Sequence, residues 1–169
     1  LRTKDKHPDT KVTVISMGGA SARDVVKHGL AMGADEGVLL EDPSFETVDA
    51  YQTAYVLSLA VKKLGAFDAI FCGRQAADLD QGMVAIGLAE LLGIPALTNG
   101  RSTELVGDNR VRFERGFTDG VGVFEANMPV LTSYSQEVGQ PRYPTLRNIM
   151  AASRKETTTW HAADLGIDT

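Results

Sequence analysis

The residues best suited to chemistry lie in the stretch Gly73–Gly82, which combines glycine, arginine and glutamine with two carboxylates, Asp78 and Asp80. The apolar run at 68–72 before it predicts a buried strand, and the apolar spacing of Met83–Leu92 after it predicts a helix. A loop between a strand and a helix start meets free backbone N–H groups and the positive end of the helix dipole, which together favour a phosphate. The carboxylates would repel a bare phosphate but can accept hydrogen bonds from ribose hydroxyls. The stretch therefore indicates a nucleotide site, and it leaves open an ordinary loop in which Asp80 caps the helix.

The rest of the chain offers little else that could react or bind a metal. Cys72, the only cysteine, ends the predicted strand at 68–72, where an inert core thiol is the favoured interpretation. The three histidines (His7, His28 and His161) are far apart and lack the spacing of metal ligands. We find no nucleophile paired with a base and no acid–base pair. We therefore expect no catalytic side chain and no metal site.

Composition limits the class of protein. The 169 residues are 43% apolar and 23% charged, which is ordinary for a globular domain with a sizeable core. The formal net charge is −5 and no run of lysine and arginine exceeds two residues, so nothing indicates binding to nucleic acid or to a membrane surface. The sequence has no signal-peptide pattern and no apolar run of membrane-spanning length, so we expect a cytoplasmic protein, or a mitochondrial matrix protein if it is eukaryotic.

Strands and helices alternate through the first half of the chain. The apolar patterns predict strands at 11–16, 36–40 and 68–72 and helices at 20–33, 47–64 and 83–92. This alternation predicts an α/β fold with a mostly parallel sheet and helices on both faces. Ligands of such sheets bind at the carboxyl ends of the strands, which here lead into the loops at 16–20, 41–43 and 73–81.

The second half has a different pattern. A hairpin is predicted around Gly107–Asn109, and further strands at 121–125 and 128–134 complete an antiparallel extension of the sheet. The prolines of Gln140–Pro144 predict a stiff extended segment before a short basic helix at 146–155. The tail from residue 157 onward shows little core-forming pattern.

Several segments, taken in order, resemble the β subunit of electron-transfer flavoproteins, including the FixA-type and electron-bifurcating branches. The similarity covers roughly residues 10–167, and its specificity comes from the order and spacing of short segments rather than from any single one. These segments are Leu30–Asp35, Gly73–Asp78 with the helix after it, Leu91–Pro95, Met128–Pro129, Pro141–Met150 and Asp164–Gly166.

The resemblance implies a fold, cofactors and a partner. The fold would be Rossmann-like, of the adenine nucleotide α-hydrolase-like type. The protein would form a heterodimer with an α subunit, and an electron-carrying FAD would be shared with that subunit or lie mainly on it. The β subunit would itself hold an adenine nucleotide, either AMP or a second FAD that takes electrons from NADH in bifurcating members. It would be an electron carrier rather than a self-contained enzyme, passing electrons between dehydrogenases and an acceptor such as a quinone oxidoreductase.

The resemblance also assigns cofactor-binding residues. Gly82, Met83 and Val84 would offer backbone N–H groups to the phosphate, and the segment Ser16–Gly18 would provide a second contact region. The full set of cofactor-binding candidates is Ser16, Met17, Gly18, Gly73, Arg74, Gln75, Ala76, Asp78, Asp80, Gln81, Gly82, Met83 and Val84.

A docking segment toward partner dehydrogenases is implied at Pro141–Met150. Leu146 would be its apolar anchor, since a proline-stiffened segment loses little entropy on binding, and Arg142, Tyr143 and Ile149 would flank it. The alternative from the pattern alone is that Leu146 packs its helix onto the domain.

The sequence departs from the family in informative places. Val84 stands where bifurcating members often carry valine and AMP-binding members carry a threonine, so it favours a flavin, whereas Met83 and Ala85 match neither version. Arg115 could lie near a flavin or the subunit interface, but Gly116 follows it where many members carry an acidic residue implicated in electron delivery.

The family pattern also extends beyond this sequence at both ends. A nucleotide-contacting strand would precede Leu1 and an arm that wraps the α subunit would follow Thr169. We therefore predict a nucleotide-binding domain at 1–150 without its first strand, and an arm segment at 151–169 that packs toward the α subunit. A stand-alone adenine-nucleotide-binding regulator of universal-stress-protein type is the alternative function, although the segment at 140–144 would have no role in it.

Overall fold

The computed structural model describes residues 1–76 and 80–168, and the chain divides into two compact units. The first unit contains Leu1–Val48 and Pro141–Thr169, and the second contains Asp49–Gln140. Within the described residues, no helix is long and apolar enough to cross a membrane.

The first unit is built on a small parallel sheet. Its order is β1 (Thr13–Met17), β2 (Glu36–Leu40) and β8 (Thr158–Trp160), so β2 is the central strand. This position explains why Val38, Leu39 and Leu40 are almost completely buried. The pairing of β8 with β2 was not predicted, because a three-residue strand is too short to show a periodic pattern.

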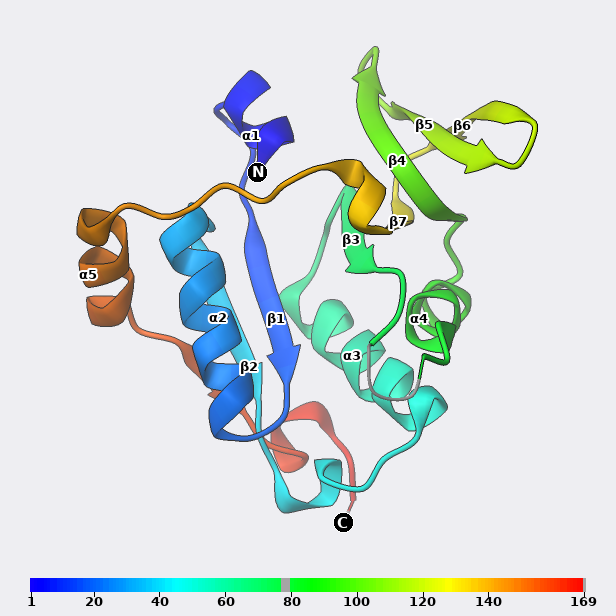
Figure 1. Cartoon of the computed structure of the whole chain (residues 1–169). Helices are drawn as coiled ribbons and strands as arrows, with labels where there is room; N and C mark the ends of the chain where they lie inside the picture. Colours follow the sequence, from blue (N-terminus) through cyan, green and yellow to red (C-terminus); the bar gives the residue numbers. More distant parts are fainter. Residues whose placement is uncertain (77–79, 169) are drawn as a thin grey trace. The chain divides into compact units, whose positions relative to one another are not determined.

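Helix α2 (Ala20–Met32) lies against β1 and β2 of this sheet. Helix α5 (Leu146–Arg154) packs on α2 (Figure 1). The core between them is made of Val26, Leu30, Ala31, Ala34 and Ala152. The short elements of this unit are α1 (Arg2–Lys6), η1 (Pro43–Phe45) and η3 (Ala163–Leu165).

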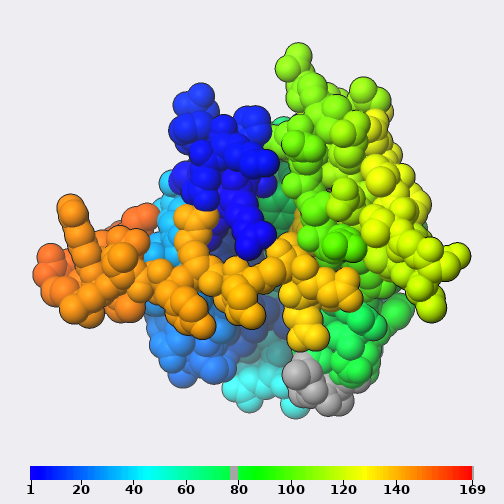
Figure 2. Space-filling view, turned by 45° about the horizontal axis from the view of Figure 1, so that its top comes forward, coloured from blue at the N-terminus to red at the C-terminus, as the bar shows by residue number. Residues whose placement is uncertain are grey.

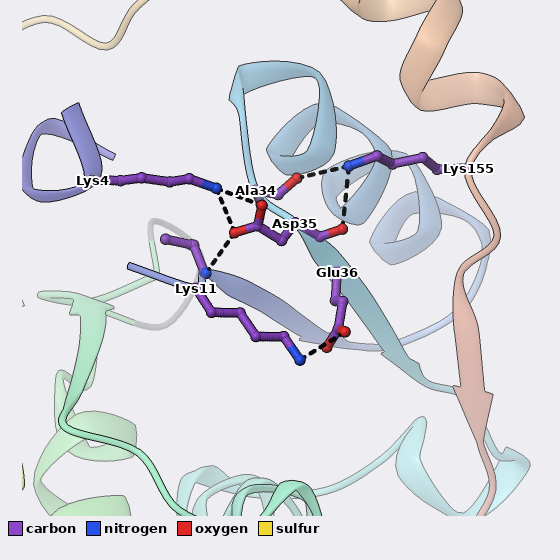
Figure 3. A network of polar contacts seen from close by, with 7 residues as sticks. Lys4, Lys11, Ala34, Asp35, Glu36 and Lys155 are labelled. Carbon is purple, nitrogen blue, oxygen red and sulfur yellow. Dashed lines mark hydrogen bonds and ion pairs between the residues drawn. The ribbon is translucent and has the colours of Figure 1, made fainter. Parts of the chain in front are cut away.

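A polar network holds the turn between α2 and β2 (Figure 3). The Asp35 carboxylate accepts hydrogen bonds from Lys4 Nζ at 2.5 Å and from the Val12 N–H at 2.8 Å. These two donors, the lysine first, hold the pKa of Asp35 below its ordinary value. From the other side, Lys155 Nζ donates to the Ala34 and Asp35 carbonyls, at 3.2 Å each. The turn is therefore tied both to α1 and to the end of α5.

The second unit contains a five-stranded mixed sheet with the order β3-β7-β4-β5-β6. Strands β3 (Ala69–Gly73), β7 (Val130–Tyr134) and β4 (Ala96–Val106) are parallel, whereas β5 (Arg110–Phe117) and β6 (Gly120–Asn127) continue from β4 as an antiparallel meander. The predicted combination of parallel strands with an antiparallel extension is confirmed. The assignment of the strand at 128–134 to that extension is wrong, because β7 pairs in parallel with both β3 and β4. A short helix, η2 (Gln136–Val138), follows β7.

Two helices, α3 (Ala50–Leu64) and α4 (Met83–Leu92), pack against each other, and α4 also packs against β4 and β7 of this sheet. Their shared core consists of Ala54, Ala85, Leu88, Ala89 and Leu131. Helix α3 begins with a capping box, in which Asp49 accepts from the Gln52 N–H and the Gln52 side chain accepts from the Asp49 N–H. Helix α4 has no such cap at its start, which is where the site lies.

Candidate functional site

The predicted loop leaves β3 at its carboxyl end and enters α4 through an uncapped helix start. The Arg74 N–H donates to the Tyr134 carbonyl at 2.8 Å, which fixes the beginning of the loop on the neighbouring strand. Gly82 is the N-cap residue, has a φ of 64° and provides no side-chain cap. The first N–H groups of α4 therefore have no side-chain acceptor at the N-cap, as the nucleotide interpretation requires.

Asp80 does not cap α4, so the alternative of an ordinary loop in which Asp80 caps the helix is wrong. Its backbone has a φ of 54° and its N–H donates to the Ala76 carbonyl at 3.1 Å. Its carboxylate accepts from Gln75 Nε2. Two left-handed residues, Asp80 and Gly82, turn the chain between the loop and the helix, so the N-cap falls two residues later than the aspartate. Gln81 between them is exposed, and the predicted Asp78 lies outside the described residues.

A pocket of about 160 Å³ lies beside this helix start. On the loop side it is lined by Arg74, Gln75, Gly82 and Ile86. This volume is below the range of roughly 300–1,000 Å³ that whole small molecules occupy, so the pocket can take one chemical group of a larger ligand. Met83 is exposed and Val84 half-buried at the first turn of the same helix.

The opposite wall consists of Thr98, Asn99 and Ser133, which the sequence did not indicate as site residues. Thr98 and Asn99 lie in β4 opposite the end of β7, where the register between the two strands shifts. The Asn99–Gly100 dipeptide is the pattern that could have revealed them, because asparagine followed by glycine commonly breaks regular strand geometry.

The segment Ser16–Gly18 lies in the first unit, whereas the loop lies in the second. Ser16 and Met17 end β1, and the Gly18 N–H donates to the Leu40 carbonyl at 2.9 Å. Gly18 has a φ of 138°, a conformation that side chains disfavour. Its contact with the same nucleotide stays a prediction.

The segment at 141–154 is at the surface of the face shown in Figure 2 (orange). Tyr143 and Leu146 are 87% and 74% exposed, and Ile149 is also exposed. Leu146 therefore does not pack its helix onto the domain, and that alternative is wrong. Arg142 is engaged within the first unit, because its guanidinium donates to both carboxylate oxygens of Asp5, and this bond lowers the pKa of Asp5.

Helix α5 carries Leu146 and Ile149, and both of its ends are held by hydrogen bonds. Thr145 caps its first turn by accepting from the Asn148 N–H at 3.2 Å. Lys27 of α2 donates from Nζ to the carbonyls of Ala152, Ser153 and Lys155 at the other end. A lysine at the carboxyl end of a helix satisfies free carbonyls and complements the dipole.

Arg115 lies on β5 with its guanidinium 5.1 Å from the centre of the Phe117 ring. It is half-buried, so it is not simply a solvated strand residue. At the neighbouring Gly116, a Cβ would lie 3.5 Å from Glu137 Oε2, so a carboxylate borders this position.

Cys72 contributes packing rather than reactivity. It packs against the core between α3, α4 and β7, and burial raises the pKa of its thiol to about 11. A thiol with this pKa carries almost no thiolate at neutral pH, in agreement with the interpretation of Cys72 as an inert core residue.

Comparison with known proteins shows to which family the sequence is similar. The family model described as 'Electron transfer flavoprotein domain' matches residues 1–165 of this sequence. An electron transfer flavoprotein subunit beta from Megasphaera elsdenii is 40% identical over 99% of this chain and 64% of its own length. The corresponding subunit of Thermoanaerobacterium thermosaccharolyticum is 43% identical over 94% of this chain and 60% of its own length. The caffeyl-CoA reductase-Etf complex subunit CarD of Acetobacterium woodii is 34% identical over 99% of this chain and 63% of its own length. The chain thus spans less than two thirds of these relatives.

Proposed function

Because this chain belongs to the electron transfer flavoprotein family, and its relatives are β subunits, we propose that it carries electrons as part of a heterodimer with an α subunit. The bound flavin supplies the redox chemistry, and the protein supplies its position and surroundings. The absence of a nucleophile or acid–base pair in the sequence fits an electron carrier rather than a self-contained enzyme. We place this complex in the cytoplasm, as the sequence indicates and as its bacterial relatives allow.

The second part of the proposal is that the second unit binds an adenine nucleotide at the loop after β3. The uncapped start of α4, with Gly82 in the left-handed conformation beside a polar pocket, is the observation that carries it. The N–H groups of Met83 and Val84 would donate hydrogen bonds to the phosphate, because anions are stabilised at such helix starts. Arg74 at the loop start adds a cation to the same pocket.

The nucleotide is either AMP or a second FAD, and Val84 favours the flavin. Valine offers no hydroxyl to the phosphate, so binding depends on backbone donors and on contacts with the rest of the ligand. If a flavin occupies this site, NADH-linked electron bifurcation is the corresponding activity.

The association with an α subunit can be tested by co-expression. The full-length gene and its neighbouring α-subunit gene are expressed together, with an affinity tag on the β subunit only. We expect a yellow complex in which both chains elute together. A colourless β subunit, or one that elutes without the α chain, contradicts the proposal.

We further propose that the Pro141–Met150 segment docks partner dehydrogenases through Leu146. Leu146 is exposed on a helix whose carboxyl end is held by hydrogen bonds from Lys27. This fits an anchor that loses little conformational entropy on binding. Leu146→Ser should lower kcat/KM for reduction of the complex by an acyl-CoA dehydrogenase of the same organism at least about tenfold, since buried anchors dominate interfaces. Val25→Ser, which alters an exposed apolar residue of α2, is the matched control and should retain the parental rate. Equal rates for the two variants would remove Leu146 from the docking surface.

A further inference from the structure

The pocket beside α4 has a wall on the sheet that is formed by a β-bulge. Strand β4 pairs with β7 through Ala96↔Leu131 and Leu97↔Thr132, and pairing resumes at Gly100↔Tyr134. Thr98 and Asn99 together therefore stand opposite the single residue Ser133. Bulges of this kind are common beside functional sites, where they redirect side chains.

Asn99 is held in an unusual conformation at this bulge. Its φ is 59°, in the left-handed region that asparagine tolerates better than most residues but that still costs about 1 kcal/mol or more. Its N–H donates to Ser133 Oγ at 3.3 Å. This bond leaves the Asn99 amide group and the Ser133 hydroxyl hydrogen available on the pocket side.

Several polar side chains that line this pocket have no partner among the described residues. Within residues 1–76 and 80–168, the structure gives no hydrogen bond or ion pair to the side chains of Arg74, Thr98 or Asn99. Ser133 is only 2% exposed, and among these residues its hydroxyl has the Asn99 N–H as its one hydrogen-bond partner. Arg74 is exposed, and Thr98 and Asn99 are half-buried. What points to a ligand is the convergence of these polar groups on one cavity beside the start of α4.

The chemistry of these groups favours an anion. The guanidinium of Arg74, the amide of Asn99 and the hydroxyls of Thr98 and Ser133 are all able to donate, and the start of α4 lies on the other side of the same pocket. The volume of about 160 Å³ suits one group rather than a whole nucleotide. The carboxylate of Asp80 is engaged by Gln75.

We propose that the bulge wall, formed by Thr98, Asn99 and Ser133, binds one phosphate group of the nucleotide. Asn99 makes the wall selective for ligands that carry a phosphate. The proposal rests on the proposed nucleotide function and adds a part of the site outside the loop motif. Asn99 donates from its amide to the phosphate, and Arg74 neutralises the charge. The left-handed backbone at Asn99 keeps the amide in the pocket.

The test uses the full-length β subunit in complex with its α subunit. Asn99→Asp keeps the side-chain shape but replaces a donor by a negative charge, and Asn99→Gly removes the amide while keeping the left-handed backbone accessible. Asn109→Asp and Asn109→Gly, in the exposed turn between β4 and β5, are the matched controls. Complexes freed of nucleotide are titrated with AMP, with adenosine and with orthophosphate in equilibrium dialysis.

We expect Asn99→Asp to raise the Kd for AMP at least about 30-fold and Asn99→Gly about tenfold, as the loss of a charge-assisted bond implies. Adenosine, which lacks the phosphate, should bind all variants alike, and orthophosphate should compete with AMP. Equal Kd values for Asn99 and Asn109 variants would overturn the proposal, and so would equal losses of AMP and adenosine. If orthophosphate binds without competing with AMP, the wall binds a free anion rather than the phosphate of the nucleotide, and the proposal is overturned. If parental complex binds no adenine nucleotide at all, the proposed function itself fails.

Discussion

Met83→Asp should release the adenine nucleotide from the second unit while leaving the unit folded. Met83 is the first residue of α4 and is 55% exposed, so an aspartate there buries no charge. A carboxylate in the first turn of a helix is favourable by about 0.3–1 kcal/mol. The same carboxylate repels a phosphate at the helix start by about 3 kcal/mol, taking a separation of ~5 Å and an effective dielectric constant of ~20. The Kd for AMP should therefore rise at least about 100-fold.

Met83→Asn is the control, because asparagine has the shape of aspartate without its charge. It should keep nucleotide affinity within about threefold of the parent, and both variants should melt near the parental temperature. Nucleotide is measured by chromatography after denaturing the purified full-length complex. Retention of a parental nucleotide content by Met83→Asp would show that the phosphate does not lie at the start of α4.

Gly100→Ala should cause the largest loss of stability among single-methyl additions to the second unit. A Cβ at Gly100 would lie 2.3 Å from two ring carbons of Phe113 and 3.1 Å from the Tyr134 ring. Phe113 is 1% exposed and packs 5.9 Å from Tyr134, between ring centres, so its ring has little room to move. Overpacking of this kind costs about 1–3 kcal/mol or more, which corresponds to a fall in Tm of about 4–8 °C per kcal/mol for a unit of this size.

Gly120→Ala provides the comparison, because a Cβ there meets nothing within 4 Å and the strand geometry is ordinary. It should change the free energy of unfolding by less than about 0.5 kcal/mol. Phe113→Leu should partly rescue Gly100→Ala, since it shortens the ring that the new methyl group meets. Differential scanning calorimetry of the full-length protein gives the Tm of the parent, of Gly100→Ala, of Gly120→Ala and of the double variant Gly100→Ala/Phe113→Leu. If Gly100→Ala has the same Tm as Gly120→Ala, the packing described for β4, β5 and β7 is refuted.

The elements with a strong hydrophobic period could be predicted from the sequence, and the irregular ones could not. Helix α4 begins and ends where its apolar spacing predicts, at Met83 and Leu92, and β2 occupies Glu36–Leu40 as predicted. Strand β8 was missed because its three residues are placed by pairing with β2, a tertiary effect. The division of the chain at residues 48 and 140 also has no local pattern.

The candidate site shows the same contrast. The loop after β3 could be found because glycine and charged residues between a strand and a helix have a local meaning. The wall at Thr98 and Asn99 depends on a register shift against β7, a strand more than thirty residues later in the chain. The alternative in which Asp80 caps the helix is wrong because the left-handed turn at Gly82 moves the helix start away from Asp80.

The nucleotide content of the purified αβ complex tests most directly the claim that this chain holds an adenine nucleotide of its own. The complex is denatured, and FAD and AMP are counted against protein by chromatography and absorbance. We predict two adenine nucleotides per αβ pair, with the second expected to be FAD because of Val84. A single FAD with no AMP would contradict the nucleotide site at the start of α4.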